Sequence, residues 1–385
     1  MVGVALGWQV YEQTYSSFAL GMVGLAEILP ILLLSLPAGH FADHADRKKI
    51  ALFTKLALVI LSALLGVLAL QNGSILLLYA VIVGIGAASA YQNPANSSLI
   101  PMMVPQEVIG NAVAWSSNAW QLGSAMGPAL GGLVIAISKS AVPVYFINVA
   151  LGILYLILLF STRSKQTNPI KSKEPVTLKS IAMGYHFLRE TPILMATITL
   201  DLFAVLLGGA VALLPIFAKD ILHVGPVGLG WMRAAPSFGA TLMAVTLAHI
   251  PPFKTAGKTL LYAVAVFGIA TIVFGVSKSF PLSLAMLFLL GAMDSISVVI
   301  RSTLLLLRTP DAMRGRVSAI NSIFVGTSNE MGAFESGVVA SWLGPIPAVV
   351  LGGVGTLFVV LATAFLSPDL RNLKTLAEPK EESVE

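Results

Sequence analysis

Long runs of hydrophobic residues, separated by short polar or charged stretches, follow one another along the whole chain. Most runs have about 20 residues, which as an α-helix is enough to cross the hydrocarbon core of a bilayer. Because backbone groups in lipid must be hydrogen-bonded within the protein, the pattern predicts an all-α integral membrane protein with twelve transmembrane helices. The expected helices are Met1–Tyr11, Ala19–Gly39, Ile50–Leu70, Ile75–Met103, Asn111–Ile137, Val142–Phe160, Pro192–Phe217, Gly228–Ile250, Thr259–Val276, Pro281–Leu307, Val317–Leu343 and Pro345–Leu366.

The first run, Met1–Tyr11, is too short to cross a bilayer. At about 1.5 Å per residue, a helix of this length spans roughly half of the hydrocarbon core. We interpret it as the second half of a truncated first helix, and we expect the native protein to have about 15–20 further residues before it.

The only long polar break, Ser161–Glu190, lies between the sixth and seventh expected helices and is rich in basic residues. It predicts a linker between two six-helix halves, with a short amphipathic helix at Thr177–Arg189 lying on the membrane surface. The expected organisation is a first half at 1–160, a linker at 161–191, a second half at 192–367 and a solvated cytoplasmic tail at 368–385.

Composition supports a membrane protein and excludes several kinds of site. Of the 385 residues, 56% are hydrophobic and only 11% are charged, whereas charged residues make up about 25% of a soluble domain. The formal net charge of +5 comes from basic residues in loops, so it does not indicate a nucleic-acid partner. The absence of cysteine excludes disulfides, thiolate metal sites and a cysteine nucleophile.

Basic residues are distributed unequally between the two sides of the expected bundle. Seventeen of the 23 Lys and Arg residues lie in the even-numbered loops, the linker and the tail, whereas three lie in the odd-numbered loops. By the positive-inside rule, the linker and both termini of the full-length protein are expected in the cytoplasm. The predicted location is the cell inner membrane.

The stretch Gly39–Lys49 is a charged island between two hydrophobic runs. Its spacing, with an acidic residue four positions after glycine and three basic residues at the end, resembles the loop between helices 2 and 3 of the major facilitator superfamily. We expect Asp43 to lie near the start of the Val317–Leu343 helix and to hold the cytoplasmic side closed, because a carboxylate is favoured beside arginine and at a helix N-terminus. The expected gate residues are Gly39, Asp43, Arg47, Lys48, Arg314 and Arg316.

The two halves also match each other weakly in sequence. Val23–Pro30 aligns with Leu229–Pro236 at an offset of 206 residues, and Gly127 aligns with Gly332 at a similar offset. Repeated halves around a binding site near the middle of the membrane are typical of secondary transporters.

Seven charged residues lie deep within the expected helices, where a charge is costly. Such residues avoid lipid and face a bundle interior or an aqueous cavity, and carboxylates among them can bind and release protons. Asp294 and Arg301 share a helix face, whereas Glu330 and Glu335 on the next helix are about 140° apart. The expected transport and proton-coupling residues are Asp201, Asp294, Arg301, Glu330, Glu335, Glu27 and Arg233.

Two further patterns occur in the first half. Small residues recur at every fourth position of the fifth helix, which lets helices approach closely, and a proline distorts that helix. These residues, which resemble the helix 5 motif of antiporters in the superfamily, are Gly123, Gly127, Pro128 and Gly131. The fourth helix contains a polar patch that we expect to line the substrate cavity, made of Tyr91, Gln92, Asn93 and Asn96.

The segments Asp294–Arg301, Arg308–Asn321 and Asn329–Gly337, together with Asp201–Gly209, resemble the enterobactin-exporter-like branch of the major facilitator superfamily. The resemblance implies the major facilitator fold and a monomeric inner-membrane exporter that moves a siderophore- or drug-like molecule by proton antiport and alternating access. The implied partners are a small-molecule substrate, protons and membrane lipid, without a cofactor or a metal.

Other functions remain open at this stage. The phosphate-loop, His-Glu-x-x-His and Gly-x-Ser-x-Gly motifs do not occur, so the sequence does not favour an enzyme. A proton-coupled importer or facilitator of a metabolite has the same expected architecture as an exporter. A membrane sensor that transports nothing is less consistent with repeated halves and buried carboxylates.

Overall fold

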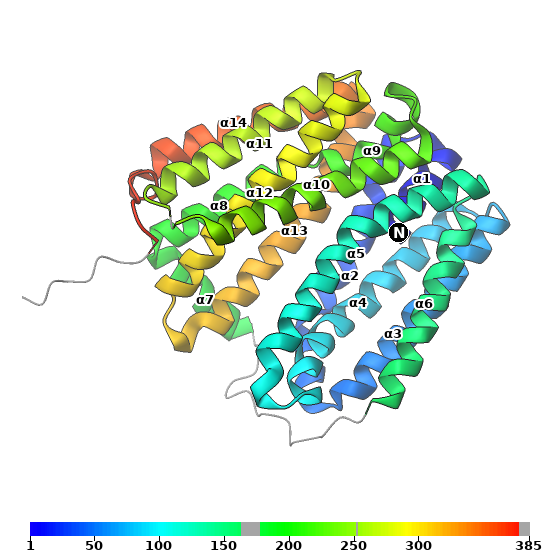
Figure 1. Cartoon of the computed structure of the whole chain (residues 1–385), viewed down its shortest axis with the longest axis horizontal. Helices are drawn as coiled ribbons and strands as arrows, with labels where there is room; N and C mark the ends of the chain where they lie inside the picture. Colours follow the sequence, from blue (N-terminus) through cyan, green and yellow to red (C-terminus); the bar gives the residue numbers. More distant parts are fainter. Residues whose placement is uncertain (163–177, 252, 377–385) are drawn as a thin grey trace, which may run out of the picture.

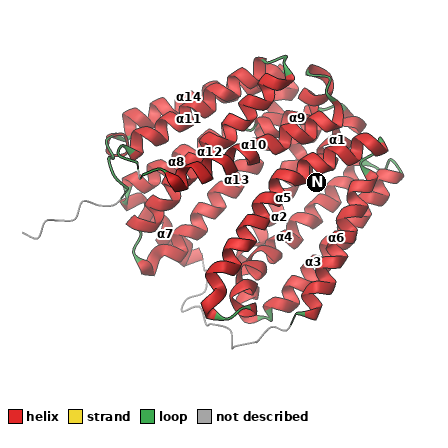
Figure 2. Cartoon of the chain, viewed as in Figure 1, coloured by secondary structure: helices red, strands yellow, loops and turns green. Residues whose placement is uncertain are grey.

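The computed structural model describes residues 1–162, 178–251 and 253–376, and these residues form helices and turns with no strand (Figure 2). Nine of the described segments are long and apolar enough to cross a membrane. Together with α1, α10 and α13, they make the twelve helices that the hydrophobic pattern predicts. These twelve are α1 (Val2–Thr14), α2 (Ser17–His44), α3 (Arg47–Leu70), α4 (Ile75–Met103), α5 (Ile109–Ser138), α6 (Val142–Ser161), α8 (Pro192–Leu207), α10 (Gly225–His249), α11 (Ala256–Val276), α12 (Phe280–Arg308), α13 (Asp311–Leu343) and α14 (Pro345–Leu366).

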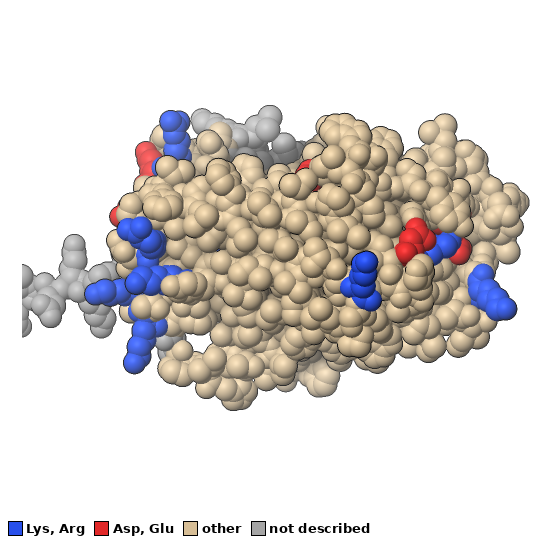
Figure 3. All heavy atoms as spheres, turned by 90° about the horizontal axis from the view of Figure 1, so that it is seen from above, with Lys and Arg blue, Asp and Glu red and all other residues tan. Residues whose placement is uncertain are grey.

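The remaining elements are short and lie between or beside the long helices. They are η1 (Gln106–Val108), α7 (Leu178–Glu190), η2 (Ala210–Leu213), α9 (Leu214–Ile216), η3 (Phe217–Ile221) and α15 (Pro368–Arg371). Uncharged residues form most of one face of the molecule, with Lys and Arg gathered at one edge and a smaller group of both charge signs toward the other (Figure 3). This distribution is the one expected of a protein surrounded by lipid.

The helices form two groups, α1–α6 and α8–α14, that lie side by side (Figure 1). Within the first group α2, α3, α4 and α6 pack together, and within the second α10, α11, α12 and α14 do so. Between the groups, the main contacts join α2 to α13 and α5 to α10. The helices α2, α6 and α12 finish at the same end of the bundle, which we call the linker end. We call the opposite end the far end.

The two halves approach most closely near the far end, through glycine. A Cβ atom added to Gly21 would lie 3.0 Å from Gly337 Cα, and one added to Gly24 would lie 2.9 Å from the Glu330 carbonyl oxygen. A Cβ atom on Gly230 of α10 would lie 2.8 Å from the Pro128 carbonyl oxygen of α5. Larger side chains at these positions would force the halves apart, so the glycines permit this closed far end.

Toward the linker end the halves diverge around a cavity of about 560 Å³. The cavity is lined by α2, α4 and α13, from Ile28 to Gly39 on the α2 side and from Thr327 to Gly315 on the α13 side. A Cβ atom added to Gly39 or Gly315 would meet nothing within 4 Å, which shows that both positions face open space.

The loop expected at Gly39–Lys49 is shorter than predicted. The helix α2 continues to His44, so only Ala45 and Asp46 separate it from α3. The Asp46 side chain accepts hydrogen bonds from the backbone N–H groups of Lys48 at 2.9 Å and Lys49 at 3.3 Å. This N-cap satisfies two amides that the helix leaves unpaired, and it starts α3 three residues before the hydrophobic run.

The helix expected at Pro192–Phe217 is also interrupted. It ends at Leu207, and Gly208 and Gly209 separate it from the short turns η2, α9 and η3. A glycine pair destabilises a helix interior, and Gly209 packs so closely on α13 that an added Cβ atom would lie 2.8 Å from Ser336 Oγ.

Two segments expected in solvent or on the membrane surface are packed against the second half. Leu188 of α7 is fully buried, and an added Cβ atom on Gly184 would lie 2.8 Å from Ile320 of α13, so α7 packs on that helix. The first part of the expected tail contacts α11: the backbone N–H of Ala256 donates to Lys374 O at 3.0 Å, and Leu370 is buried. Burial of these leucines outweighs the polar character of both segments.

Replacing Gly24 with alanine should destabilise the closed far end. Overpacking of this kind costs about 1–3 kcal/mol, which corresponds to a shift of roughly 5- to 150-fold between two conformations. Spin labels on Gln71→Cys and Lys278→Cys, in a chain that has no native cysteine, would measure the distance between the halves at the far end. We expect a larger fraction of long distances in Gly24→Ala. The control is Gly326→Ala, whose added Cβ atom meets nothing within 4 Å; equal distance distributions in the two variants would contradict the packing argument.

Candidate functional site

Three charged side chains interact electrostatically where the halves come together, and we call them the interhalf cluster: Glu27 of α2, Arg233 of α10 and Glu330 of α13. Arg233 interacts electrostatically with Glu330 and with Glu27. Its Nη1 atom also donates a hydrogen bond to the Gly3 carbonyl oxygen of α1, at 3.2 Å. An arginine of the second half thus contacts a backbone carbonyl of the first half and is attracted by a carboxylate of that half.

The interhalf cluster lies at the inner end of the large cavity. The residues lining the cavity reach Ile28 on α2, next to Glu27, and Thr327 on α13, one helical turn before Glu330. Beyond the cluster, toward the far end, Gly21 and Gly337 close the space between the halves. The charges therefore separate a cavity that widens toward the linker end from the closed far end.

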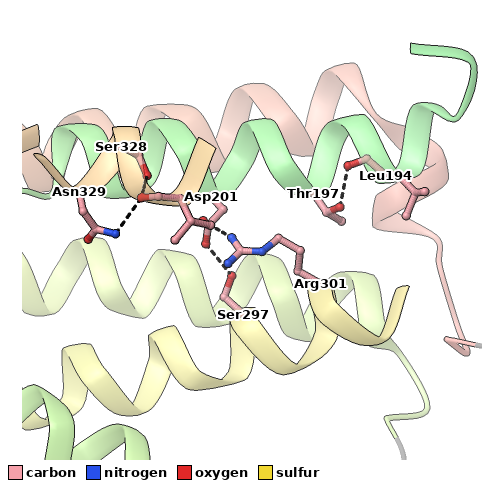
Figure 4. A network of polar contacts seen from close by, with 8 residues as sticks. Leu194, Thr197, Asp201, Ser297, Arg301, Ser328 and Asn329 are labelled. Atoms are coloured by element: carbon pink, nitrogen blue, oxygen red, sulfur yellow. Dashed lines mark hydrogen bonds and ion pairs between the residues drawn. The ribbon is translucent and has the colours of Figure 1, made fainter. Parts of the chain in front are cut away.

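A second group of polar side chains lies within the second half, between α8 and α12. Arg301 forms an ion pair with Asp201, and the two side chains are 5% and 7% exposed. The Ser297 hydroxyl donates to Asp201 Oδ1 at 3.4 Å, so the arginine and the serine both face this carboxylate (Figure 4). We call Asp201, Asp294, Ser297 and Arg301 the α8–α12 cluster.

Asp294 belongs to this cluster through a small shared cavity. Asp201, Asp294 and Ser297 line a space of about 10 Å³. The sequence left open whether Arg301 would meet Asp294, which shares its helix face. In the structure Arg301 pairs with Asp201 of α8, because the neighbouring helix offers a carboxylate at the level of the guanidinium.

Glu335, the remaining acid of the expected set, is half-buried and belongs to neither cluster. Its Oε2 atom accepts a hydrogen bond from Ser336 Oγ at 3.4 Å. Ser328 and Asn329, near Glu330 in sequence, donate to the Val325 carbonyl oxygen of their own helix at 3.0 Å and 2.8 Å. These polar groups of α13 are therefore satisfied locally and do not reach across the halves (Figure 4).

The polar patch expected to line the substrate cavity is only partly found there. Asn93 and its neighbour Pro94 line the cavity. Tyr91 packs edge-on against Phe41, with ring centroids 6.2 Å apart, and Asn96 accepts a hydrogen bond from Tyr155 at 3.4 Å. Gln92 is half-buried and does not line this cavity.

Some contacts of the expected gate residues lie within the described part of the chain. Arg314 pairs with Asp311 of its own helix at 2.6 Å, and Arg316 Nη1 lies 3.3 Å from Met313 Sδ. Lys48 donates to the Phe160 carbonyl oxygen at the end of α6, at 3.2 Å. The Asp43 side chain lies outside the described residues, so its contact with the start of α13 stays a prediction.

The helix 5 residues have different surroundings. Added Cβ atoms on Gly127 and Gly131 would lie 3.3 Å and 3.1 Å from backbone atoms of Met1, whereas one on Gly123 would meet nothing within 4 Å. The closest approach of α5 to the other half involves Gly132, next in sequence, and Gly230. The sequence does not distinguish Gly21, Gly132, Gly230 and Gly337 as the glycines where the halves touch, because glycine is common in all these helices and only the packing shows the contacts.

Replacing one member of the Asp201–Arg301 pair should lower the stability of the folded protein more than replacing both. Breaking a buried ion pair costs about 3–5 kcal/mol, because an uncompensated charge remains, whereas replacing both partners with apolar groups is often neutral or stabilising. We expect Arg301→Met to lower the melting temperature in detergent strongly and Asp201→Leu/Arg301→Met to recover most of the loss. If the two single effects simply add in the double variant, the pair does not contribute as an interacting unit.

Comparison with known proteins places these features in a family. The family described as a transmembrane secretion effector matches residues 1–383. Similar relatives include the enterobactin exporter EntS of Citrobacter koseri, 25% identical over 97% of this chain and 89% of the relative. Another is the multidrug efflux pump Tap of Mycolicibacterium fortuitum, 25% identical over 98% of this chain and 93% of the relative.

Solved structures with the same fold are also found. A bacterial homologue of the human lysosomal transporter Spinster, in an inward-facing and occupied conformation, superposes with a TM-score of 0.73 at 16% identity, covering 98% of this chain and 95% of that one. The nucleoside transporter NupG superposes with a TM-score of 0.71 at 12% identity, covering 94% of each chain. The family match over nearly the whole chain shows that this protein is a multi-pass membrane transporter of the transmembrane secretion effector family, with the major facilitator fold.

Proposed function

We propose that this transporter exports a small molecule by proton antiport, with alternating access and with the linker end in the cytoplasm. The orientation is supported by the excess of basic residues in the loops and segments of the linker end. Export is supported by the names of two relatives, an enterobactin exporter and a multidrug efflux pump. The proposed location is the cell inner membrane.

The observation that favours proton coupling is the interhalf cluster. Two carboxylates, Glu27 and Glu330, interact electrostatically with one guanidinium, that of Arg233. When both are ionised, the cluster has an excess negative charge in a poorly solvated position, and binding one proton removes that excess. Because the arginine connects the halves, a change of charge on Glu330 changes how strongly the far end is held closed.

A transport cycle follows from this arrangement. With Glu330 protonated, Arg233 interacts with Glu27 and Gly3 O of the first half alone, and the far end is held closed. When Glu330 loses its proton toward the linker end, it competes for Arg233 and weakens the bond between the halves. The far end then opens while substrate occupies the cavity, so the substrate can leave to the outside. A proton taken up from outside restores the closed far end.

The lining of the cavity indicates the chemistry of the substrate. Among the described side chains, the lining is largely aliphatic, with Ser, Thr and Asn groups that can form a few hydrogen bonds; it includes Ile28, Leu32, Ser35, Asn93, Ser322 and Thr327. None of these described lining residues is charged. The cavity therefore suits a largely apolar molecule with some hydrogen-bonding groups better than a highly charged one.

The α8–α12 cluster is proposed to have a different role, because its ion pair lies within one half. Asp201 and Arg301 do not separate when the halves move relative to each other as rigid bodies. Asp294, which lines the adjoining cavity without being the partner of Arg301, is a second candidate for proton binding.

Glu330→Gln should abolish pH-driven efflux, because glutamine keeps the shape of the side chain but does not bind or release a proton. The measurement is efflux of lipophilic dyes and catecholate compounds from proteoliposomes with an imposed pH gradient, together with proton influx. The matched control is Glu335→Gln, on the same helix but outside the interhalf cluster, which should keep proton-coupled efflux.

Three results would overturn parts of the proposal. Coupled proton influx at the wild-type rate in Glu330→Gln would remove Glu330 from the coupling role. Substrate uptake coupled to protons moving in the same direction would identify an importer. No substrate movement in the wild type, with any of the compounds, would favour a sensor.

A further inference from the structure

A second cavity, of about 340 Å³, lies at the far end of the first half and has no role in the proposed transport cycle. It is formed where α1 ends, between the α3–α4 turn and the α5–α6 turn, and it is bounded on one side by η3 of the second half. Unlike the large cavity, it has a mainly polar lining. The lining residues that matter here are Gln9, Glu12, Asn72, Lys139, Ser140 and Lys219.

The side chain of Gln9 has a hydrogen-bond donor that no described residue pairs with. The side chain is 6% exposed, and its Oε1 atom accepts a hydrogen bond at 2.7 Å from the hydroxyl of Tyr145, which is itself fully buried. Because Oε1 is engaged in this contact, the other polar atom of the amide is the donor Nε2. No described group accepts a hydrogen bond from Nε2. A buried donor left without a partner costs about 1–3 kcal/mol, so an acceptor entering the cavity at this point would be favoured.

The cavity also has an excess of positive charge. Lys219 Nζ lies 3.6 Å from Glu12 Oε1, donates to Tyr15 at 3.2 Å, and faces the rings of Tyr15 and Trp8. Asp220, the next residue, accepts a hydrogen bond from the Tyr11 hydroxyl. Lys219 is thus compensated by Glu12.

Lys139, on the other side of the cavity, has no such compensation. It ends α5 in the left-handed conformation, with φ 54°, and no ion pair joins it to a described residue. A lysine without an ion pair and an unpaired amide donor thus line the same cavity. This combination suits an oxyanion, because an ammonium supplies charge and an N–H group supplies direction.

We propose that this far-end cavity binds a small oxyanion, a phosphate or carboxylate group, between Lys139 and the Nε2 atom of Gln9. The group belongs either to the head of an anionic lipid or to a soluble anion. Gln9 and Lys139 come from the first half and Lys219 from the second, so a bound anion also strengthens the contact between the halves. Occupancy therefore stabilises the conformation with a closed far end. The proposal does not depend on proton coupling.

The test measures thermal unfolding of the purified full chain by tryptophan fluorescence. In detergent, inorganic phosphate is titrated against sodium chloride at constant ionic strength. In nanodiscs, phosphatidylglycerol is compared with phosphatidylcholine alone. We expect saturable stabilisation by at least one of the two anions: by inorganic phosphate if the ligand is a soluble anion, and by phosphatidylglycerol alone if it is a lipid head.

Three variants decide whether the effect comes from this cavity. Lys139→Gln removes the charge, and Gln9→Glu keeps the acceptor for Tyr145 while replacing the unpaired donor with an oxygen. Each should weaken the apparent anion affinity by about tenfold or more. Lys278→Gln, an exposed lysine of another far-end turn, should behave as the wild type. Absence of stabilisation by either anion in the wild type, or unchanged affinity in Lys139→Gln, would overturn the proposal.

Discussion

The close approach of the two halves through glycine is the constraint on which the rest of this structure depends. Gly21 and Gly24 allow α2 to lie against α13, and Gly230 allows α10 to lie against α5. In a bilayer, helices gain no hydrophobic free energy by leaving lipid for each other, so association depends on tight van der Waals packing. Because both lines of contact are closest near the far end, the helices diverge toward the linker end and leave the large cavity between them.

The buried charges are arranged around that geometry in two different ways. Arg233 links the halves, since it donates a hydrogen bond to the Gly3 carbonyl oxygen of the first half and interacts electrostatically with Glu27 of that half and Glu330 of its own. Arg301 instead pairs with Asp201 inside the second half. An ion pair inside one rigid body stabilises that body in every conformation, whereas one between two bodies changes the equilibrium between conformations.

The far end is therefore closed by three successive layers of contact. The glycines bring the backbones together, the interhalf cluster adds charge at the inner end of the cavity, and α1 is joined to η3 at the surface by the Tyr11–Asp220 and Lys219–Glu12 contacts. At the linker end, α7 and α15 pack on helices of the second half. The contacts at the two ends of the described structure thus differ. Those at the far end join the two halves, whereas α7 and α15 at the linker end pack on the second half alone.

The hydrophobic pattern by itself determined the number and approximate position of the long helices, because most of them must match the bilayer thickness. It also identified Asp201 and Arg301, the charged side chains that are buried among the described residues, because few charges occur within apolar runs. It did not determine where α2 ends, since the Asp46 cap and not hydrophobicity sets that boundary, nor the interruption at Gly208. The interaction partners of the charged side chains were decided only by the tertiary structure. Spacing along a helix shows which residues share a face, but whether Arg301 meets Asp294 or Asp201 depends on which neighbouring helix packs there. The far-end cavity depends on tertiary structure in the same way, since its residues come from turns far apart in sequence and share no local pattern.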